Sequence, residues 1–93
     1  MKWPFEDKRN VASITSNAIV DGTDWIAYVS HDADDGMWQF LGANGPPSED
    51  EAAVVSLQSI FERDPSVGDL ATLPLGWCAS RASKASTWTK RKA

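Results

Sequence analysis

Residues 25–42 decide the fold: they read WIAYVSH (25–31), DADDG (32–36) and MWQFLG (37–42). The two outer runs are rich in aromatic and β-branched residues, which favour strands. The Asp-Gly that closes the acidic segment between them is typical of a tight hairpin turn. We therefore expect antiparallel strands over 25–31 and 37–42. Side chains alternate between the two faces of a strand, so Trp38 and Phe40 share a face, and we expect both to be buried.

Two further strands are expected, one on each side of this hairpin in the sequence. Residues 11–16 are rich in β-branched residues and precede turn signals at Asn17 and at Asp21-Gly22. Residues 77–81 follow the turn sequence LPLG at 73–76. Both segments are short enough to be single strands of one sheet.

Residues 48–62 allow two interpretations. Ser48 and Glu51 fit a capping box that would begin one helix running to Glu62. Residues 53–55 instead resemble a short buried strand, after which Ser56 would cap a shorter helix. The local pattern leaves both interpretations open.

The size of the chain and its single cysteine limit the class of protein. The chain has 93 residues, which suits one domain, and Cys78 has no second cysteine with which to form an internal disulfide. The longest apolar stretch, residues 25–29, is far shorter than the roughly 18 residues that suggest a membrane span. Acidic residues and a proline near the N-terminus do not fit a secretory signal. We therefore expect a cytoplasmic protein held together by packing, and the sequence leaves its oligomeric state open.

Charge is distributed unevenly along the chain, whose formal net charge is −4. Between residues 11 and 80, Arg63 is the only base against eleven acids, whereas residues 81–93 carry five bases and no acid. An acidic body repels phosphate, so a nucleic-acid partner is disfavoured and could contact only residues 84–92. The acidic body suits a basic protein partner instead.

Residues 31–36 bring one histidine and three aspartates together, which raises the question of a metal site. The segment fails twice as an EF-type calcium loop, because Gly36 is fifth instead of sixth and Ala43 stands where a glutamate is needed. We predict no metal site and no cofactor. The three aspartates are expected to form either a solvated hairpin tip or an acidic patch that steers a basic partner; they are Asp32, Asp34 and Asp35.

An enzymatic alternative rests on His31 and Cys78, the one base and the one thiol that suit a thiol enzyme. Such chemistry requires the fold to place the two side chains within hydrogen-bond reach. A single cysteine among small apolar residues is more often a packed core residue. We therefore favour a non-catalytic binding protein and keep the thiol enzyme as the alternative. Trp3 and Trp88, outside the expected strands, are candidates for contact with a partner or for covering a sheet edge.

A longer pattern of short motifs runs through the chain. Its main parts are SIT (13–15), VSHD (29–32), DDGMWQFL (34–41), VVSL (54–57), RDPS (63–66) and LPLGW (73–77). In order and spacing these motifs resemble a family of small bacterial proteins of unknown function that is related to immunity proteins of toxin systems. The resemblance covers about residues 11–88. It implies a compact α+β fold and a strand over 52–55 followed by a helix from about residue 56. It implies no catalytic residue, and the immunity role belongs to only part of the broader group.

The expected architecture is a single α+β domain over residues 11–83. A mainly antiparallel sheet of about five strands carries two short helices packed on it, near 57–64 and 66–72. The second helix is expected because Asp64 is a favoured helix cap and Pro65 suits the first helical position. Residues 1–10 are expected to form an N-terminal arm, and residues 84–93 a basic C-terminal tail that is solvated and frayed.

Overall fold

The hairpin expected at residues 25–42 lies at the centre of the sheet. The computed structural model describes residues 2–93, and β2 (Tyr28–His31) pairs antiparallel with β3 (Trp38–Leu41). Trp38 and Phe40 are both fully buried, which confirms the prediction from alternation. The connecting turn closes at Gly36, whose φ of 73° lies in the left-handed region that favours glycine.

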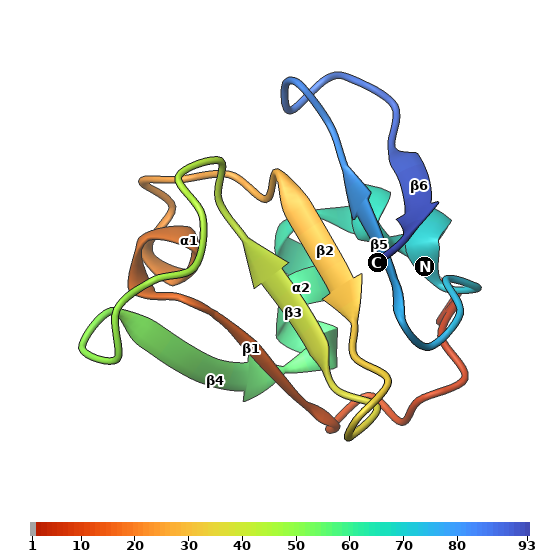
Figure 1. The fold of residues 1–93 in the computed structure, drawn as a ribbon. Coiled ribbons are helices and arrows are strands. Elements are labelled where there is room, and N and C mark those ends of the chain that lie inside the picture. The colour runs from red at the N-terminus through yellow and green to blue at the C-terminus, as the bar shows by residue number, and fades with distance from the viewer. Residues whose placement is uncertain (1) are drawn as a thin grey trace.

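Six strands form one mixed sheet within residues 2–93, in the order β4-β1-β3-β2-β5-β6 (Figure 1). Three of the expected strands are β1 (Ala12–Ser16), β4 (Ala52–Ser56) and β5 (Trp77–Ser80). The expected number of about five strands is exceeded because β6 (Thr89–Lys92) pairs antiparallel with β5. Most pairs are antiparallel, as predicted, but β1 and β3 run parallel.

The C-terminal residues form a strand where the sequence predicts a frayed end. Trp88, just before β6, packs against the core, and its Nε1 donates to the carbonyl oxygen of Ser66 at 3.2 Å. The ladder from β5 to β6 continues to the last residue, where the Ala93 N–H donates to the carbonyl oxygen of Gly76 at 2.9 Å. The prediction of fraying is wrong because backbone pairing and the Trp88 contact hold this segment despite the repulsion among its basic side chains.

The ambiguity over residues 48–62 is resolved in favour of a strand and a shorter helix. β4 leads directly into α2 (Leu57–Arg63), and the Oγ of Ser56 accepts a hydrogen bond from the N–H of Ser59 at 3.1 Å, which caps the helix. The alternative of one helix beginning near residue 49 is wrong. The second expected helix is η1 (Pro65–Leu70), a 3₁₀ helix. The carboxylate of Asp64 caps it by accepting from the Ser66 N–H at 3.1 Å.

A third short helix, α1 (Asn17–Asp21), lies where the sequence predicts only a turn. The Oγ of Ser16 caps it by accepting from the Ile19 N–H at 3.2 Å, and Gly22 ends it with a φ of 88°. Ile19 is buried, and this apolar contact with the core extends the turn into a helix. Within residues 2–93, none of the helices has the length and apolar character needed to cross a membrane.

The core lies between one face of the sheet and the helices α2 and η1. Buried apolar side chains from both layers meet there, including Val29, Trp38, Phe40, Leu57, Ile60, Val67 and Leu70. The N-terminal arm also contributes. Phe5 is only 6% exposed, and its ring lies edge-on to that of Trp38 with centroids 5.4 Å apart.

Candidate functional site

One face of the sheet carries no helix. In the view of Figure 1, α2 lies behind the sheet, so the viewer looks onto the opposite face. We call this the open face. The strand residues whose side chains alternate toward it include Ile14, Tyr28, Ser30, Gln39, Leu41, Val54, Cys78 and Arg91. Of these, Leu41 and Cys78 are buried. Register places six of the open-face residues in one row across all the strands, in the order Val54, Ile14, Gln39, Ser30, Cys78 and Arg91.

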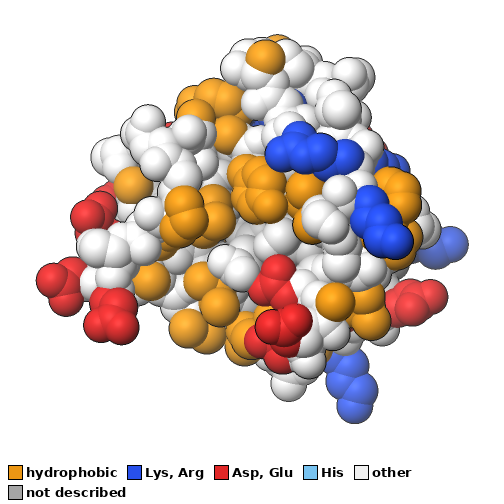
Figure 2. Space-filling view, viewed as in Figure 1, with side chains coloured by type: hydrophobic (Ala, Val, Ile, Leu, Met, Phe, Trp, Pro, Cys, Tyr) orange, Lys and Arg blue, Asp and Glu red, His pale blue; other side chains and the backbone are white. Residues whose placement is uncertain are grey.

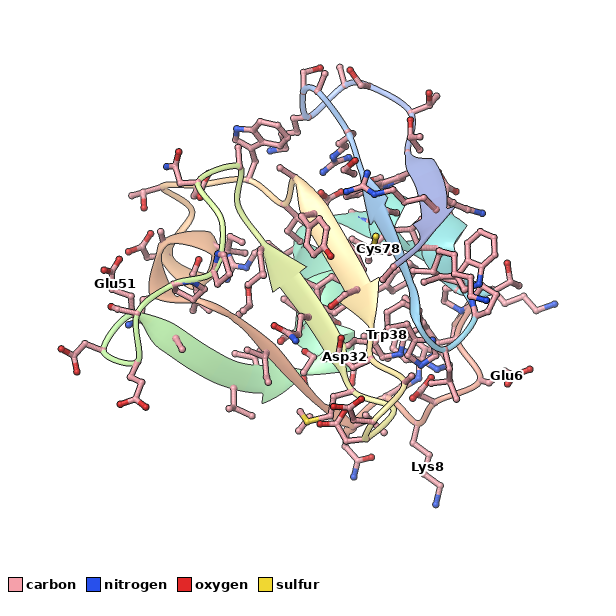
Figure 3. The ribbon with its side chains drawn as sticks, in the orientation of Figure 1. Glu6, Lys8, Asp32, Trp38, Glu51 and Cys78 are labelled. Atoms are coloured by element: carbon pink, nitrogen blue, oxygen red, sulfur yellow. The ribbon has the colours of Figure 1, made fainter. Side chains whose placement is uncertain are left out.

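Asp32 is held on the open face by two neighbouring side chains (Figure 3). Its Oδ1 accepts a hydrogen bond from the Oγ of Ser30 at 3.0 Å, and its Oδ2 accepts one from the Nε2 of Gln39 at 2.6 Å. Because Ser30 lies on β2 and Gln39 on β3, the carboxylate ties the two strands together at the base of the turn. Asp32 is therefore a positioned carboxylate and differs from the two other acids of the predicted tip.

Asp34 and Asp35 are exposed at the tip of the hairpin. The Oδ1 of Asp35 accepts a hydrogen bond from the backbone N–H of Met37 at 2.9 Å, which is how an aspartate shapes a turn. This bond leaves its negative charge exposed to solvent. The three acids that the sequence groups together thus divide into one that ties the strands, one that shapes the turn and one that is simply exposed.

A second acidic segment precedes β4. Glu49, Asp50 and Glu51 are all exposed, and Glu51 lies at the start of that strand in Figure 3. Together with Asp34 and Asp35 they form what we call the acidic rim. Figure 2 looks onto the open face and shows hydrophobic side chains across its middle, acidic side chains mainly below and on the left, and Lys and Arg mainly at the upper right. At the lower right and right edge lie Lys8 and Glu6, which Figure 3 labels.

The open face is hollowed between the hairpin tip and the C-terminus. This depression has a volume of about 590 Å³, and its lining includes Tyr28, Ser30, Asp32, Gln39 and Trp77. Burial raises the pKa of Tyr28, and the neighbouring Cys78 thiol adds to the rise. The phenol is therefore protonated at neutral pH. The depression offers hydroxyl, amide and carboxylate groups to a partner.

His31 and Cys78 do not form the dyad that a thiol enzyme needs. Cys78 pairs in register with Ser30 and lies on the open face. His31 is the next residue of β2, so its side chain points to the other face, where it stacks on Trp38. Its Nδ1 donates to the carbonyl oxygen of Leu73 at 2.7 Å. The sheet separates the base from the thiol, so these two residues do not supply the dyad on which the enzymatic alternative rests.

Trp3 and Trp88 are half-buried at the surface of the core. The Nε1 of Trp3 donates to the carbonyl oxygen of Asp7 at 2.7 Å, and its ring meets that of Phe61 edge-on. The ring of Trp88 covers the guanidinium of Arg81 at 4.1 Å. Each indole thus covers the core with one part of its surface and exposes the rest, so both stay candidates for contact with a partner.

Arg81 is a buried charge whose role the sequence did not indicate. Its side chain is 1% exposed and forms an ion pair of 2.6 Å with Asp64, and its Nε donates to the carbonyl oxygen of Ile26 at 2.9 Å. Burial acts to raise the pKa of Asp64, but the hydrogen bonds from Ser66 and Arg81 outweigh it and hold the pKa below its ordinary value. This pair joins β5 to the start of η1 and is structural.

The sequence analysis singles out the tip acids and the two tryptophans but misses Ile14, Gln39 and Val54. Alternation along residues 12–16 and 52–56 indicates which side chains share a face of each strand, but only the strand register places Ile14 beside Val54.

Among residues 2–93, no three His, Cys, Asp or Glu side chains lie close enough together to hold a metal ion. Comparison of the chain with family models, curated proteins and solved structures found no match.

Proposed function

We propose that this chain is a small non-catalytic binding protein of the immunity type, which acts in the cytoplasm and binds a basic protein partner through its open face and acidic rim. The observation that carries the proposal is the exposure of the five rim acids. Among the residues that the structure describes, the ion pair between Arg81 and Asp64 is the only one, and it involves no rim acid. The field of the rim is therefore available to attract a positively charged protein.

Apolar side chains at the β4 edge of the open face support the same proposal. Val54 is 69% exposed, and Ile14 lies directly beside it in the sheet. Protein interfaces combine an apolar centre with a polar or charged rim. The apolar residues would supply buried area, while the acids around them select a partner of opposite charge.

The narrower immunity assignment is supported by the order of motifs over residues 11–88. These motifs resemble small bacterial proteins related to immunity proteins of toxin systems. Neutralising a toxin by binding requires a complementary surface and no chemistry. An acidic binding surface fits such a role when the partner is basic.

Affinity capture from the host cell with mass spectrometry tests the proposal. The chain offers a matched pair of variants: Asp34→Asn with Glu49→Gln removes two charges from the rim, and Glu62→Gln with Asp69→Asn removes two exposed charges on α2 and η1. We expect wild type and the second variant to retain a stoichiometric basic protein that the rim variant retains poorly. Equal retention by all three proteins, or a partner with an acidic surface, would contradict the proposal.

A further inference from the structure

The two outer strands of the sheet differ in how well they resist pairing with another strand. β6 carries Lys90, Arg91 and Lys92, and lysine-rich edges discourage the addition of a strand. β4 has the sequence AAVVS, without a charge or a proline. The sheet is therefore protected at the β6 edge, and β4 is the edge at which another strand can add.

The hydrogen bonds between β1 and β4 identify the backbone groups that face outward. The N–H of Leu57 donates to the Val11 carbonyl oxygen at 2.8 Å, and the N–H of Asn17 donates to the Glu51 carbonyl oxygen at 2.7 Å. Antiparallel pairs alternate between bonded and non-bonded, so the register directs the backbone groups of residues 53 and 55 toward β1. The backbone groups of residues 52, 54 and 56 then point away from the sheet.

Val54 is the centre of this outward edge. The N–H of Ala52 donates to the Ser48 carbonyl oxygen at 3.0 Å, and the carbonyl oxygen of Ser56 accepts from the Ser59 Oγ at 2.7 Å. The remaining outward groups have no partner among residues 2–93: both backbone groups of Val54, the carbonyl of Ala52 and the N–H of Ser56. An added strand needs this spacing of donors and acceptors.

The side chains around this edge indicate the chemistry of the segment that would add to it. Val54 is 69% exposed, so the residue with the free backbone groups also presents an apolar side chain. Glu49, Asp50 and Glu51, which directly precede β4, are exposed and negative. A segment that alternates apolar and basic residues matches both features.

We propose that β4 is the docking strand, to which an extended Lys- or Arg-containing segment of the partner adds as a further strand by β-augmentation. This inference rests on the proposed function, since it specifies how the basic partner binds. It places the main-chain contacts at Val54 and the charge contacts at residues 49–51.

A peptide titration tests the inference directly. The probe is a capped synthetic peptide that alternates lysine and valine, and its control replaces each lysine with glutamate. The affinity is measured from NMR amide shifts. The protection of the backbone is measured from the rate of hydrogen exchange at the Val54 and Ser56 amides. We expect the lysine peptide to bind and to slow exchange at both amides by roughly tenfold, and the glutamate peptide to do neither.

Two variants of Val54 separate the edge from the charge. Val54→Pro removes an outward N–H, which an edge strand tolerates, and Val54→Lys keeps the backbone but adds a repelling charge at an exposed position. Each should weaken binding of the lysine peptide by roughly tenfold. Lys90→Pro is the matched control, because β6 pairs with β5 so that the N–H of Lys90 also points outward. It should leave binding unchanged.

The possible results distinguish this inference from the proposed function. If both Val54 variants bind the lysine peptide as wild type does, docking at β4 is overturned, while the proposal of a basic partner still stands. Equal affinity for the lysine and glutamate peptides would contradict both. No binding of either peptide would overturn docking at β4 alone, since the proposed partner is a basic protein bound through the whole open face and the acidic rim. Protection of the Val54 amide that rises with protein concentration, without peptide, would assign the edge to a second copy of this chain and overturn the inference.

Discussion

The imidazole of His31 lies flat against the indole of Trp38, with ring centroids 3.9 Å apart and planes inclined by 9°. The same imidazole donates through Nδ1 to the carbonyl oxygen of Leu73 at 2.7 Å. The residue that the sequence offers as a catalytic base therefore packs on the core and anchors the turn before β5.

Because His31 packs on the core, we expect its replacement to destabilise the fold. His31→Ala should lower the free energy of unfolding by about 1–2 kcal/mol, through the lost hydrogen bond and the lost ring contact. Urea denaturation of wild type and the variant measures this. A His31→Ala variant that keeps wild-type stability would show that neither contact matters to the fold.

Trp38 should be the most costly side chain to remove. It is fully buried, and its ring contacts those of Phe5, Phe40 and His31. Trp38→Ala should cost about 3–5 kcal/mol through lost transfer energy and the cavity left behind, and Trp38→Phe should cost less. Thermal melting measures both, and an alanine variant that melts within a few degrees of wild type would contradict this packing.

The Asp64–Arg81 pair makes stability depend on pH. The pKa of Asp64 is lower in the folded chain than in the unfolded chain, because its hydrogen bonds from Ser66 and Arg81 outweigh the effect of burial. Ionised Asp64 therefore stabilises the fold above its unfolded pKa of about 3.9, and this stabilisation is lost as the pH falls through the folded pKa. Asp64→Asn should cost about 3 kcal/mol at neutral pH, since it leaves the buried guanidinium unpaired. The cost of Asp64→Asn in free energy of unfolding, measured from urea midpoints between neutral and acidic pH, should become smaller as the pH falls. A cost that does not change with pH would contradict the ion pair.

The C-terminal segment should contribute stability through Trp88 and little through its bases. Trp88→Ala should cost about 2 kcal/mol, because it removes the ring over Arg81 and the hydrogen bond to Ser66. Lys90→Gln with Lys92→Gln should change the free energy of unfolding by no more than about 0.5 kcal/mol, because both side chains are exposed. A larger cost for the lysine pair than for Trp88→Ala would contradict this assignment.

The parts of the fold that the sequence predicts are those fixed by local chemistry. The β2–β3 hairpin follows from alternation and an Asp-Gly turn, whereas the Ser56 cap offers α2 only as one of two interpretations of residues 48–62. The parallel pairing of β1 with β3 and the addition of β6 to β5 join segments distant in the sequence, so no local pattern indicates them. Likewise, the acidic tip is visible in the sequence, but the separate role of Asp32 depends on Gln39 as well as on the nearby Ser30, and only the strand register brings Gln39 beside it.

The salt dependence of association with the captured partner tests the central claim most directly. The rim variant, Asp34→Asn with Glu49→Gln, is compared with wild type and with the control variant, Glu62→Gln with Asp69→Asn. Association rates are measured on both sides of about 0.1 M ionic strength, where the Debye length is about 10 Å. We predict that the rates of wild type and control fall steeply with salt, while the rim variant associates several-fold more slowly at low salt and with a weaker salt dependence. Equal rates and equal salt dependence for all three proteins would contradict an acidic surface that recognises a basic partner.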